Sequence, residues 1–444
     1  MYVASEILYG ITKKISLVNF MDIVYTKNRH ENVNSSYISI YEQYVSEASF
    51  LWILRSISIN EPHNIKSDIT SLEERIDAQH DGLMTSIEIG WQVCDNALEI
   101  QEPGEVFTAL VIAMRSHDPE KIKTAVHAGL NSPATLPGII SALGWLPSDV
   151  VSPWIERFLY GKDLQHKFLG LAACSVRRFD PGDVLLSILK REDCTQEIKL
   201  YSRALRLVGE LRRQDCMPFL QDAYNNSNDD IKFWSNWSSI LLGDIKNAEN
   251  LKDFVFKIGP YQNKAIQIVF RVLPIDMARE WISELSKDVK QTRVVIKSIG
   301  ILGDPNAVNW LIDKMNDPLY AKLSAESFVY ITGVDLEENG LNIDTPENYP
   351  LIPNDDMYDD IMDLDEDENL PYPDVVKLSL IWKKYGQKFI VGKRYFMGEL
   401  ITPKLLKDNV NNGTQRQRHS AALELAINEN GTPLINTRAK VSIR

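Results

Sequence analysis

The sequence lacks several features on which common classes of protein depend. Its 444 residues include only four cysteines, too few for a disulfide framework in a chain of this length, so we expect a reducing environment. No apolar run approaches the roughly 18 to 20 residues that a membrane span needs. The nearest candidate, Ile15 to Tyr25, is interrupted by Asn19 and Asp22. Met1 to Ile11 also lacks the basic start of a secretory signal. We therefore predict a cytoplasmic protein with no membrane partner.

The familiar catalytic and metal-binding motifs are missing as well. We find no glycine-rich phosphate loop, no Gly-x-Ser-x-Gly, no His-Glu-x-x-His and no Cys-x-x-Cys. The cysteines lie 80, 20 and 22 residues apart with no histidine nearby, which favours buried thiols over zinc ligands: Cys94, Cys174, Cys194 and Cys216. Asp363, Asp365 and Asp367 imitate the start of a calcium loop, but Glu368 stands where such a loop needs glycine. The sequence therefore predicts no enzyme, no metal site and no cofactor.

The net charge of -13 is unevenly distributed along the chain. Lys377 to Arg444 holds 13 basic and four acidic residues, a surplus of +9 that leaves -22 for the rest. Nine acidic residues lie within the fourteen from Asp355 to Glu368. Like charges at this density resist compaction, so we expect a solvated acidic linker over residues 336–373. The basic tail either lies beside this linker and is partly neutralised by it, or contacts nucleic acid. Because the repeats described next are acidic, which opposes phosphate binding, we predict no nucleic-acid partner.

A short pattern recurs along the middle of the chain. Five segments of small or apolar residues close on a glycine, and these glycines lie 65, 34, 60 and 30 residues apart: Gly144, Gly209, Gly243, Gly303 and Gly333. The intervals correspond to one or two units of about thirty residues, a period typical of repeat proteins. Glycine favours the left-handed C-terminal cap of a helix, and the Asp-Pro pairs at 118–119 and 304–305 are typical helix starts. Each unit is thus predicted to be a pair of helices.

The apolar residues of these units follow helical spacing. Val295, Ile299 and Leu302 form one such stripe, which a single helix pair cannot bury. Stacked pairs do bury it, so we predict an all-α, HEAT-like α-solenoid over residues 104–335, the alternative being a conventional globular helical domain. Six tryptophans of the repeats are expected in the core rather than in a ligand groove: Trp145, Trp154, Trp234, Trp237, Trp281 and Trp310.

The chain outside the repeats is expected to divide into four further parts. Residues 1–35 form an N-terminal extension and residues 36–103 an N-terminal helical cap. The cap holds a helix at 37–57 and a second helix opened by a capping box of Ser71 and Glu74. Beyond the acidic linker at 336–373, residues 374–444 form a basic C-terminal helical unit. This unit is predicted to contain helices at 374–385 and 415–428 and a small hairpin that bends at glycines.

Several short strings resemble one protein family. The C-terminal strings are GKRYFMG at 392–398, ITP at 401–403, GTQRQR at 413–418 and AALELA at 421–426; the N-terminal strings are EASFLW at 47–52, LEERI at 72–76, DGL at 81–83 and GEVF at 104–107. Together they resemble an uncharacterised proteobacterial HEAT-repeat family that is often encoded beside type VI secretion genes. The resemblance implies a partner in secretion, such as a spike protein, an effector or its immunity system, and it carries over no catalytic residues. The first 35 residues and the enlarged acidic block depart from this family and inherit no role.

Five basic or aromatic residues form the candidate partner-binding patch, because Arg and Tyr dominate interface hot spots: Lys393, Arg394, Tyr395, Arg416 and Arg418. In the alternative interpretation, Arg416 and Arg418 bind the acidic segment or neighbouring helix ends inside the fold.

Two functions follow from these observations. The first is a non-enzymatic protein-protein interaction scaffold, an adaptor, chaperone or immunity-type factor linked to type VI secretion. The second is a HEAT-like enzyme or ligand carrier with a groove between the repeats and the C-terminal unit.

Overall fold

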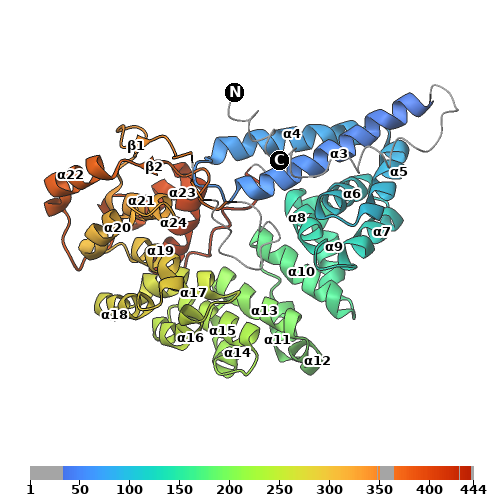
Figure 1. Cartoon of the computed structure of the whole chain (residues 1–444). Helices are drawn as coiled ribbons and strands as arrows, with labels where there is room; N and C mark the ends of the chain where they lie inside the picture. The colour runs from blue at the N-terminus through green and yellow to red at the C-terminus, as the bar shows by residue number, and fades with distance from the viewer. Residues whose placement is uncertain (1–33, 348, 351–364, 430, 442–444) are drawn as a thin grey trace.

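The computed structural model describes residues 34–347, 349–350, 365–429 and 431–441, and it shows an all-α, HEAT-like α-solenoid. Successive helices stack side by side along a curved path (Figure 1). An N-terminal helical cap stands at one end of this path, and a C-terminal helical unit that contains a small hairpin follows the other end. The predicted fold class is therefore confirmed. Residues 1–33 of the expected N-terminal extension lie outside the described part of the chain.

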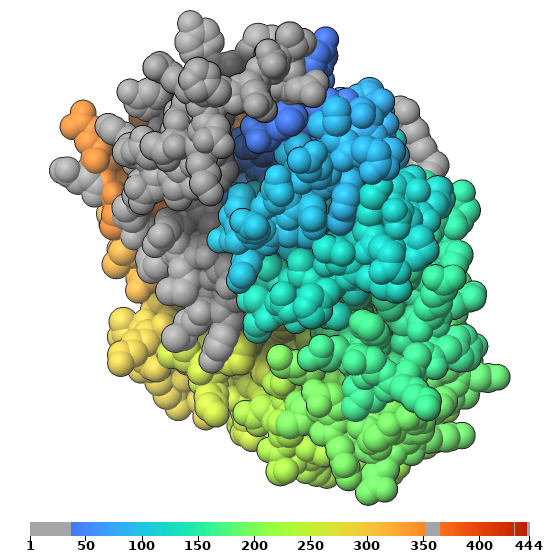
Figure 2. Space-filling view, turned by 90° about the vertical axis from the view of Figure 1, so that its right-hand side faces the viewer, coloured from blue at the N-terminus to red at the C-terminus, as the bar shows by residue number. Residues whose placement is uncertain are grey.

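Three helices form the cap, namely α3 (Asn34–Ser58), α4 (Lys66–Met84) and α5 (Ile87–Ala97). Helix α3 confirms the helix predicted at 37–57, and its many apolar residues pack into the core. The capping box predicted at Ser71 is wrong, because α4 begins five residues earlier. There the Asp68 carboxylate accepts a hydrogen bond of 2.9 Å from the Ile65 N–H. In the space-filling view the cap and the first repeats form one continuous surface (Figure 2).

The repeats consist of two rows of helices. The inner row contains α6 (Pro103–Ser116), α8 (Leu136–Trp145), α10 (Leu164–Arg177), α13 (Ile198–Leu211), α15 (Asp229–Leu241), α17 (Gln262–Val272), α19 (Thr292–Leu302) and α21 (Ala321–Thr332). The other row contains α7 (Pro119–Leu130), α9 (Ser148–Tyr160), α11 (Asp183–Lys190), α12 (Glu192–Gln196), α14 (Met217–Ala223), α16 (Lys252–Phe256), α18 (Ile275–Leu285) and α20 (Val308–Lys314). Each inner helix packs against the next inner helix, which buries the apolar stripes. Asp118 caps α7 as predicted, since its carboxylate accepts from two main-chain N–H groups.

Three of the five repeat glycines lie at helix ends in a left-handed conformation, as predicted: Gly243, Gly303 and Gly333. The same prediction is wrong for Gly144 and Gly209, which lie inside α8 and α13. A Cβ atom at Gly209 would lie 2.7 Å from the Ser238 Cα, so this glycine allows α13 and α15 to approach closely. Helix α13 ends instead at Arg212, which itself adopts the left-handed conformation with a φ of 56°.

The C-terminal unit contains the remaining elements. Strand β1 (Asn342–Ile343) pairs antiparallel with β2 (Tyr372–Pro373), and then follow α22 (Val375–Tyr385), β3 (Tyr395–Phe396), β4 (Glu399–Leu400), α23 (Pro403–Asn412) and α24 (Gln415–Asn428). Helices α22 and α24 confirm the helices predicted at 374–385 and 415–428. The predicted hairpin is the antiparallel pair β3-β4, whose turn residues Met397 and Gly398 both have positive φ.

The C-terminal unit covers part of the concave side of the solenoid. Helix α24 contacts α15 and α17, and Ala426 belongs to the apolar core of the later repeats. The segment after α24 returns to the cap, where Lys440 Nζ lies 2.7 Å from Asp77 Oδ2. In Figure 1, α23 and α24 lie between the last repeats and the ends of α3 and α4. The cap and the C-terminal unit are therefore held together across the concave side.

The acidic linker expected at 336–373 is packed at both of its described ends, so a wholly solvated linker is wrong. Leu336 and Leu341 are buried in the core of the later repeats. Asp367 is only 1% exposed, because Arg293 of α19 lies 2.7 Å from its carboxylate and neutralises it. Residues 348 and 351–364, which include most of the acidic block, lie outside the described residues.

Candidate functional site

A cleft of about 580 Å³ lies between the repeats and the C-terminal unit, and we call it the central cleft. Helices α13, α15, α17, α19 and α21 form its repeat wall. Helix α24 and the tail segment 434–438 form the opposite wall, and residues 57–61 at the end of α3 close one side. The cleft is thus assembled from parts of the chain that are far apart in sequence.

Aromatic and cationic side chains meet on the repeat wall. The Arg206 guanidinium carbon lies 4.6 Å from the centre of the Trp234 ring, and Arg206 Nε donates to Glu210 Oε1 over 2.9 Å. Glu210 is 1% exposed and accepts a second hydrogen bond from the Ser175 hydroxyl. Burial raises the pKa of Glu210, but the charges of Arg206 and Arg178 outweigh it and hold this pKa at about 2. Glu210 therefore stays ionised and holds Arg206 over the indole.

A buried ion-pair cluster attaches α24 to the repeats. Arg394 forms two hydrogen bonds of 2.8 Å to the Glu424 carboxylate, and Arg271 Nε lies 3.2 Å from the same group. Burial lowers the pKa of Arg271 to about 10, although the Glu424 charge acts in the opposite direction. The planar fork of Arg394 fits the carboxylate in the two-bond geometry that makes such pairs strong. Glu424 is thus the counter-charge for the buried Arg271 and the partly buried Arg394.

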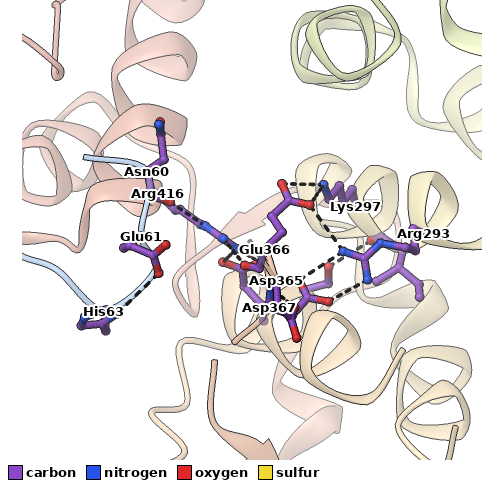
Figure 3. A network of polar contacts seen from close by, with 12 residues as sticks. Asn60, Glu61, His63, Arg293, Lys297, Asp365, Glu366, Asp367 and Arg416 are labelled. Carbon is purple, nitrogen blue, oxygen red and sulfur yellow. Dashed lines mark hydrogen bonds and ion pairs between the residues drawn. The ribbon is translucent and has the colours of Figure 1, made fainter. Parts of the chain in front are cut away.

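Arg416 links the C-terminal unit to three other segments (Figure 3). It donates to the Asn60 carbonyl over 3.0 Å and to the Glu366 carbonyl over 2.5 Å. Its Nη1 lies 3.3 Å from the Glu326 carboxylate. The Glu366 carboxylate is in turn 3.0 Å from Lys297 Nζ. The acidic segment is therefore neutralised through its side chains by the repeats, while Arg416 of the basic tail binds its main chain.

His419 joins the cap, α24 and the tail. Its Nε2 lies 2.7 Å from the Ile59 carbonyl, and its Nδ1 lies 2.6 Å from the Thr437 hydroxyl. Burial lowers the pKa of His419 to about 3, so the ring is neutral. Nε2–H then donates to the carbonyl and Nδ1 accepts from the hydroxyl. Because both nitrogens are engaged, His419 holds the structure together and is poorly placed to act as a base.

The tail beyond α24 has no helix or strand in its described residues and is bound to the concave face, as residues 434 and 436 show. The Leu434 N–H donates to the Glu210 carbonyl over 3.0 Å, and the Leu434 carbonyl accepts from Arg178 Nε over 2.5 Å. The Asn436 side chain donates to the Val176 carbonyl over 2.8 Å. The inner helices thus already bind the main chain of the non-helical tail at Leu434, and this tail continues along one wall of the central cleft.

The five predicted patch residues do not form one exposed surface. Lys393 is exposed, but Arg394 belongs to the Glu424 cluster and Tyr395 is 7% exposed. Arg418 is buried and donates to the Val410 carbonyl at the end of α23. For the two tail arginines, the alternative interpretation is therefore confirmed, since Arg416 and Arg418 bind the acidic segment and a helix end. Only Tyr395 and Arg416 also line the central cleft.

Sequence reasoning missed the polar residues of the repeat wall. Asn263, Lys264 and Gln267 of α17 line the cleft, yet their sequence shows only the polar face of an amphipathic helix. The prediction of core rather than groove positions is correct for Trp145 and Trp281, which are 4% and 6% exposed, whereas Trp237 is 7% exposed but lines the cleft. Trp234 is half-buried and also borders the cleft. No local signal distinguishes a polar face that turns inward from one that turns to solvent.

The chemistry of the described residues provides no evident nucleophile or metal site. Burial raises the pKa of all four cysteine thiols, to about 12 for Cys174 and Cys216, and a thiol in this state is unreactive. Within the described ranges, no group of His, Cys, Asp and Glu side chains is arranged to hold a metal ion. Asp363 of the imitated calcium loop lies outside those ranges, and Asp367 is bound by Arg293.

Comparisons with protein-family models, with curated proteins and with solved structures find no match for this chain. Among the helices of the described residues, none combines the length and the apolar content that crossing a bilayer demands. The central cleft is therefore the feature on which the proposed function rests.

Proposed function

We propose that this protein is a non-enzymatic binding scaffold that holds an extended segment of a partner polypeptide in the central cleft. The observation that carries this proposal is the bound tail, whose main chain is held at Leu434 by Glu210 and Arg178. A face that satisfies the hydrogen bonds of one non-helical segment offers the same kind of surface to another. Peptide recognition commonly takes affinity from main-chain hydrogen bonds and specificity from neighbouring side chains.

The side chains around the cleft suit such a segment. Trp234 with its stacked Arg206 offers a flat surface, and amphipathic aromatic and Arg side chains dominate the energetics of interfaces. Asn263 and Gln267 add amide groups beside it, which both donate and accept hydrogen bonds. Most buried charges, by contrast, are already paired with one another, as the pairing of Glu424 with two arginines illustrates. This arrangement favours recognition over acid-base catalysis.

Site-specific photo-crosslinking from the cleft tests the proposal in the full chain. A photoreactive amino acid at Asn263 should capture a polypeptide, whereas the same group at the exposed Lys246, outside the cleft, should not. Capture from Lys246 alone, or equally from both positions, would contradict a cleft-bound partner. The family resemblance makes a type VI secretion spike component or an effector the first partner to test.

A second candidate function is supported by the size of the cleft. Its volume of about 580 Å³ lies within the range of roughly 300 to 1,000 Å³ that small-molecule sites occupy. In this reading the protein carries a ligand of low molecular weight against Trp234 and Trp237. Native mass spectrometry of the purified chain distinguishes the two functions, because a carrier should retain a small adduct that is lost when Trp234 is changed to alanine.

A further inference from the structure

Helix α22 of the C-terminal unit and the segment after it form a strongly basic surface. Between Asp374 and Arg394 the chain has six basic residues and one acidic residue, although the whole chain carries a net charge of -13. Arg394 turns inward to Glu424, which leaves five lysines: Lys377, Lys383, Lys384, Lys388 and Lys393. All five are exposed, and α22 stands at the outer edge of the molecule (Figure 1).

Large apolar side chains are exposed among these lysines. Val376 is 72% exposed and Leu380 62%, while Ile390 and Val391 in the following segment are 60% and 56% exposed. We call these four residues, together with the five lysines, the terminal patch. The outward face of a surface helix is ordinarily polar, because no other element covers it. The exposed apolar residues therefore mark a surface that another structure covers.

Local packing brings the members of the terminal patch close together. Leu380 lies four residues after Val376 along α22, and Lys383 and Lys384 lie three and four residues after Leu380, which places all four on one helix face. The Phe389 ring packs on Trp382 with centroids 5.6 Å apart, so the segment that carries Ile390 and Val391 folds back on the same helix. Two lysines also converge on one ring at the helix end, since Lys384 and Lys388 lie 4.9 and 5.0 Å from the Tyr385 centroid.

The composition of the terminal patch identifies the kind of partner. Protein interfaces are enriched in Arg, Trp and Tyr and depleted in Lys, whereas this surface exposes five lysines and four aliphatic side chains beside one tyrosine, Tyr385. Lysines beside aliphatic residues are typical of surfaces that bind anionic bilayers, because ammonium groups attract the headgroups and the aliphatic groups enter the interface. We propose that the terminal patch docks the protein on the surface of an anionic lipid bilayer. This proposal is independent of the central cleft and departs from the expectation of no membrane partner.

Vesicle flotation of the full chain tests this docking. The protein should float with vesicles that contain phosphatidylserine and not with phosphatidylcholine alone, and added salt should weaken the binding. Each lysine near such a surface contributes about fivefold to affinity, so Lys383→Gln with Lys384→Gln should weaken binding about twenty-five-fold. Leu380→Ser with Ile390→Ser should also weaken it while leaving the charge unchanged. All four positions are exposed, and circular dichroism should report an unchanged fold for each pair of substitutions.

The matched control uses two exposed lysines that flank an exposed apolar residue elsewhere. Lys287 and Lys290 enclose Val289, which is 76% exposed, in the loop before α19. Lys287→Gln with Lys290→Gln removes the same charge and should leave vesicle binding unchanged. An equal loss in this control, or equal binding to neutral and anionic vesicles, would overturn the proposal. So would binding to polyglutamate through Lys383 and Lys384 without binding to vesicles, which would assign the patch to an acidic protein instead.

Discussion

Replacing His80 with leucine should make the protein markedly less sensitive to acid. His80 lies on α4 with no exposed surface, and its ring packs 5.5 Å from the Phe107 ring. Among the described residues, neither of its ring nitrogens has a hydrogen-bond partner. Burial lowers the pKa of His80 to about 3, helped by the positive charges of Arg115 and Lys440 and opposed by Asp81. The folded state therefore holds this histidine neutral.

The size of the effect follows from proton linkage. The unfolded chain protonates histidine at an ordinary pKa of about 6.5, so between about pH 6.5 and pH 3 the unfolded state binds one proton more than the folded state. The free energy of unfolding then falls as the pH falls through this window. From pH 7 to pH 5 the loss is about 2 kcal/mol for His80. His419, whose pKa is lowered mainly by burial to about 3, adds a similar amount.

Urea unfolding at several pH values, followed by tryptophan fluorescence, measures this loss. His80→Leu should be as stable as the wild type or more stable at neutral pH, because it removes two unpaired polar atoms from the core. It should lose about 2 kcal/mol less between pH 7 and pH 5. The control Ile76→Val on the same helix should lower stability by about 1 kcal/mol at every pH. An unchanged pH dependence in His80→Leu, or a His80 resonance that titrates near pH 6.5 in NMR spectra, would refute the reasoning.

Docking of the C-terminal unit is expected to depend on Glu424. Glu424→Ala leaves the buried guanidinium of Arg271 and the partly buried one of Arg394 without a counter-charge, so it should cost about 3 to 5 kcal/mol and speed amide exchange over residues 415–428. Glu399→Ala at an exposed position should do neither. Gly303→Ala should lower the melting temperature, because the φ of Gly303 is 71° and a Cβ atom there would lie 2.2 Å from a carbonyl oxygen of β3. Gly259→Ala is the control, since no atom lies within 4 Å of a Cβ atom at Gly259. An equal drop in melting temperature for the control would contradict this explanation. The four cysteines are all buried: Cys94, Cys174, Cys194 and Cys216. Thiol reagents should therefore leave them unmodified in the folded protein at about pH 8 and react with them only after unfolding in urea. Rapid labelling of the native chain would show that burial does not protect these thiols.

The repeat architecture was predictable because its signals are local. Helical spacing of apolar residues and the glycines at 303 and 333 report on one helix and its end, and neither depends on distant parts of the chain. The errors occurred where tertiary contacts decide the outcome. Gly209 resembles a cap in the sequence, yet it lies inside α13 because another helix packs closely against it. Likewise the acidic segment near Asp367 looks solvated until Arg293 is found beside it.

The candidate site was less predictable than the fold. Arg394, Arg416 and Arg418 were predicted as partner-binding residues, but their sequence does not reveal whether they face solvent or a partner inside the fold. The partners lie far away in sequence; Arg416, for example, contacts Glu326 and Asn60. Charge pairs at such separations leave no periodic or local pattern.

By itself the sequence determined that the chain forms paired helices, because helix starts, helix ends and apolar stripes are set by interactions within about one turn. Only the tertiary structure decided that the C-terminal unit turns back across the concave side and encloses a cleft. That arrangement depends on a few buried contacts between distant segments, such as that of Glu424 with Arg271. Their free energy arises from desolvated charges brought together by the whole fold, and no stretch of sequence contains it.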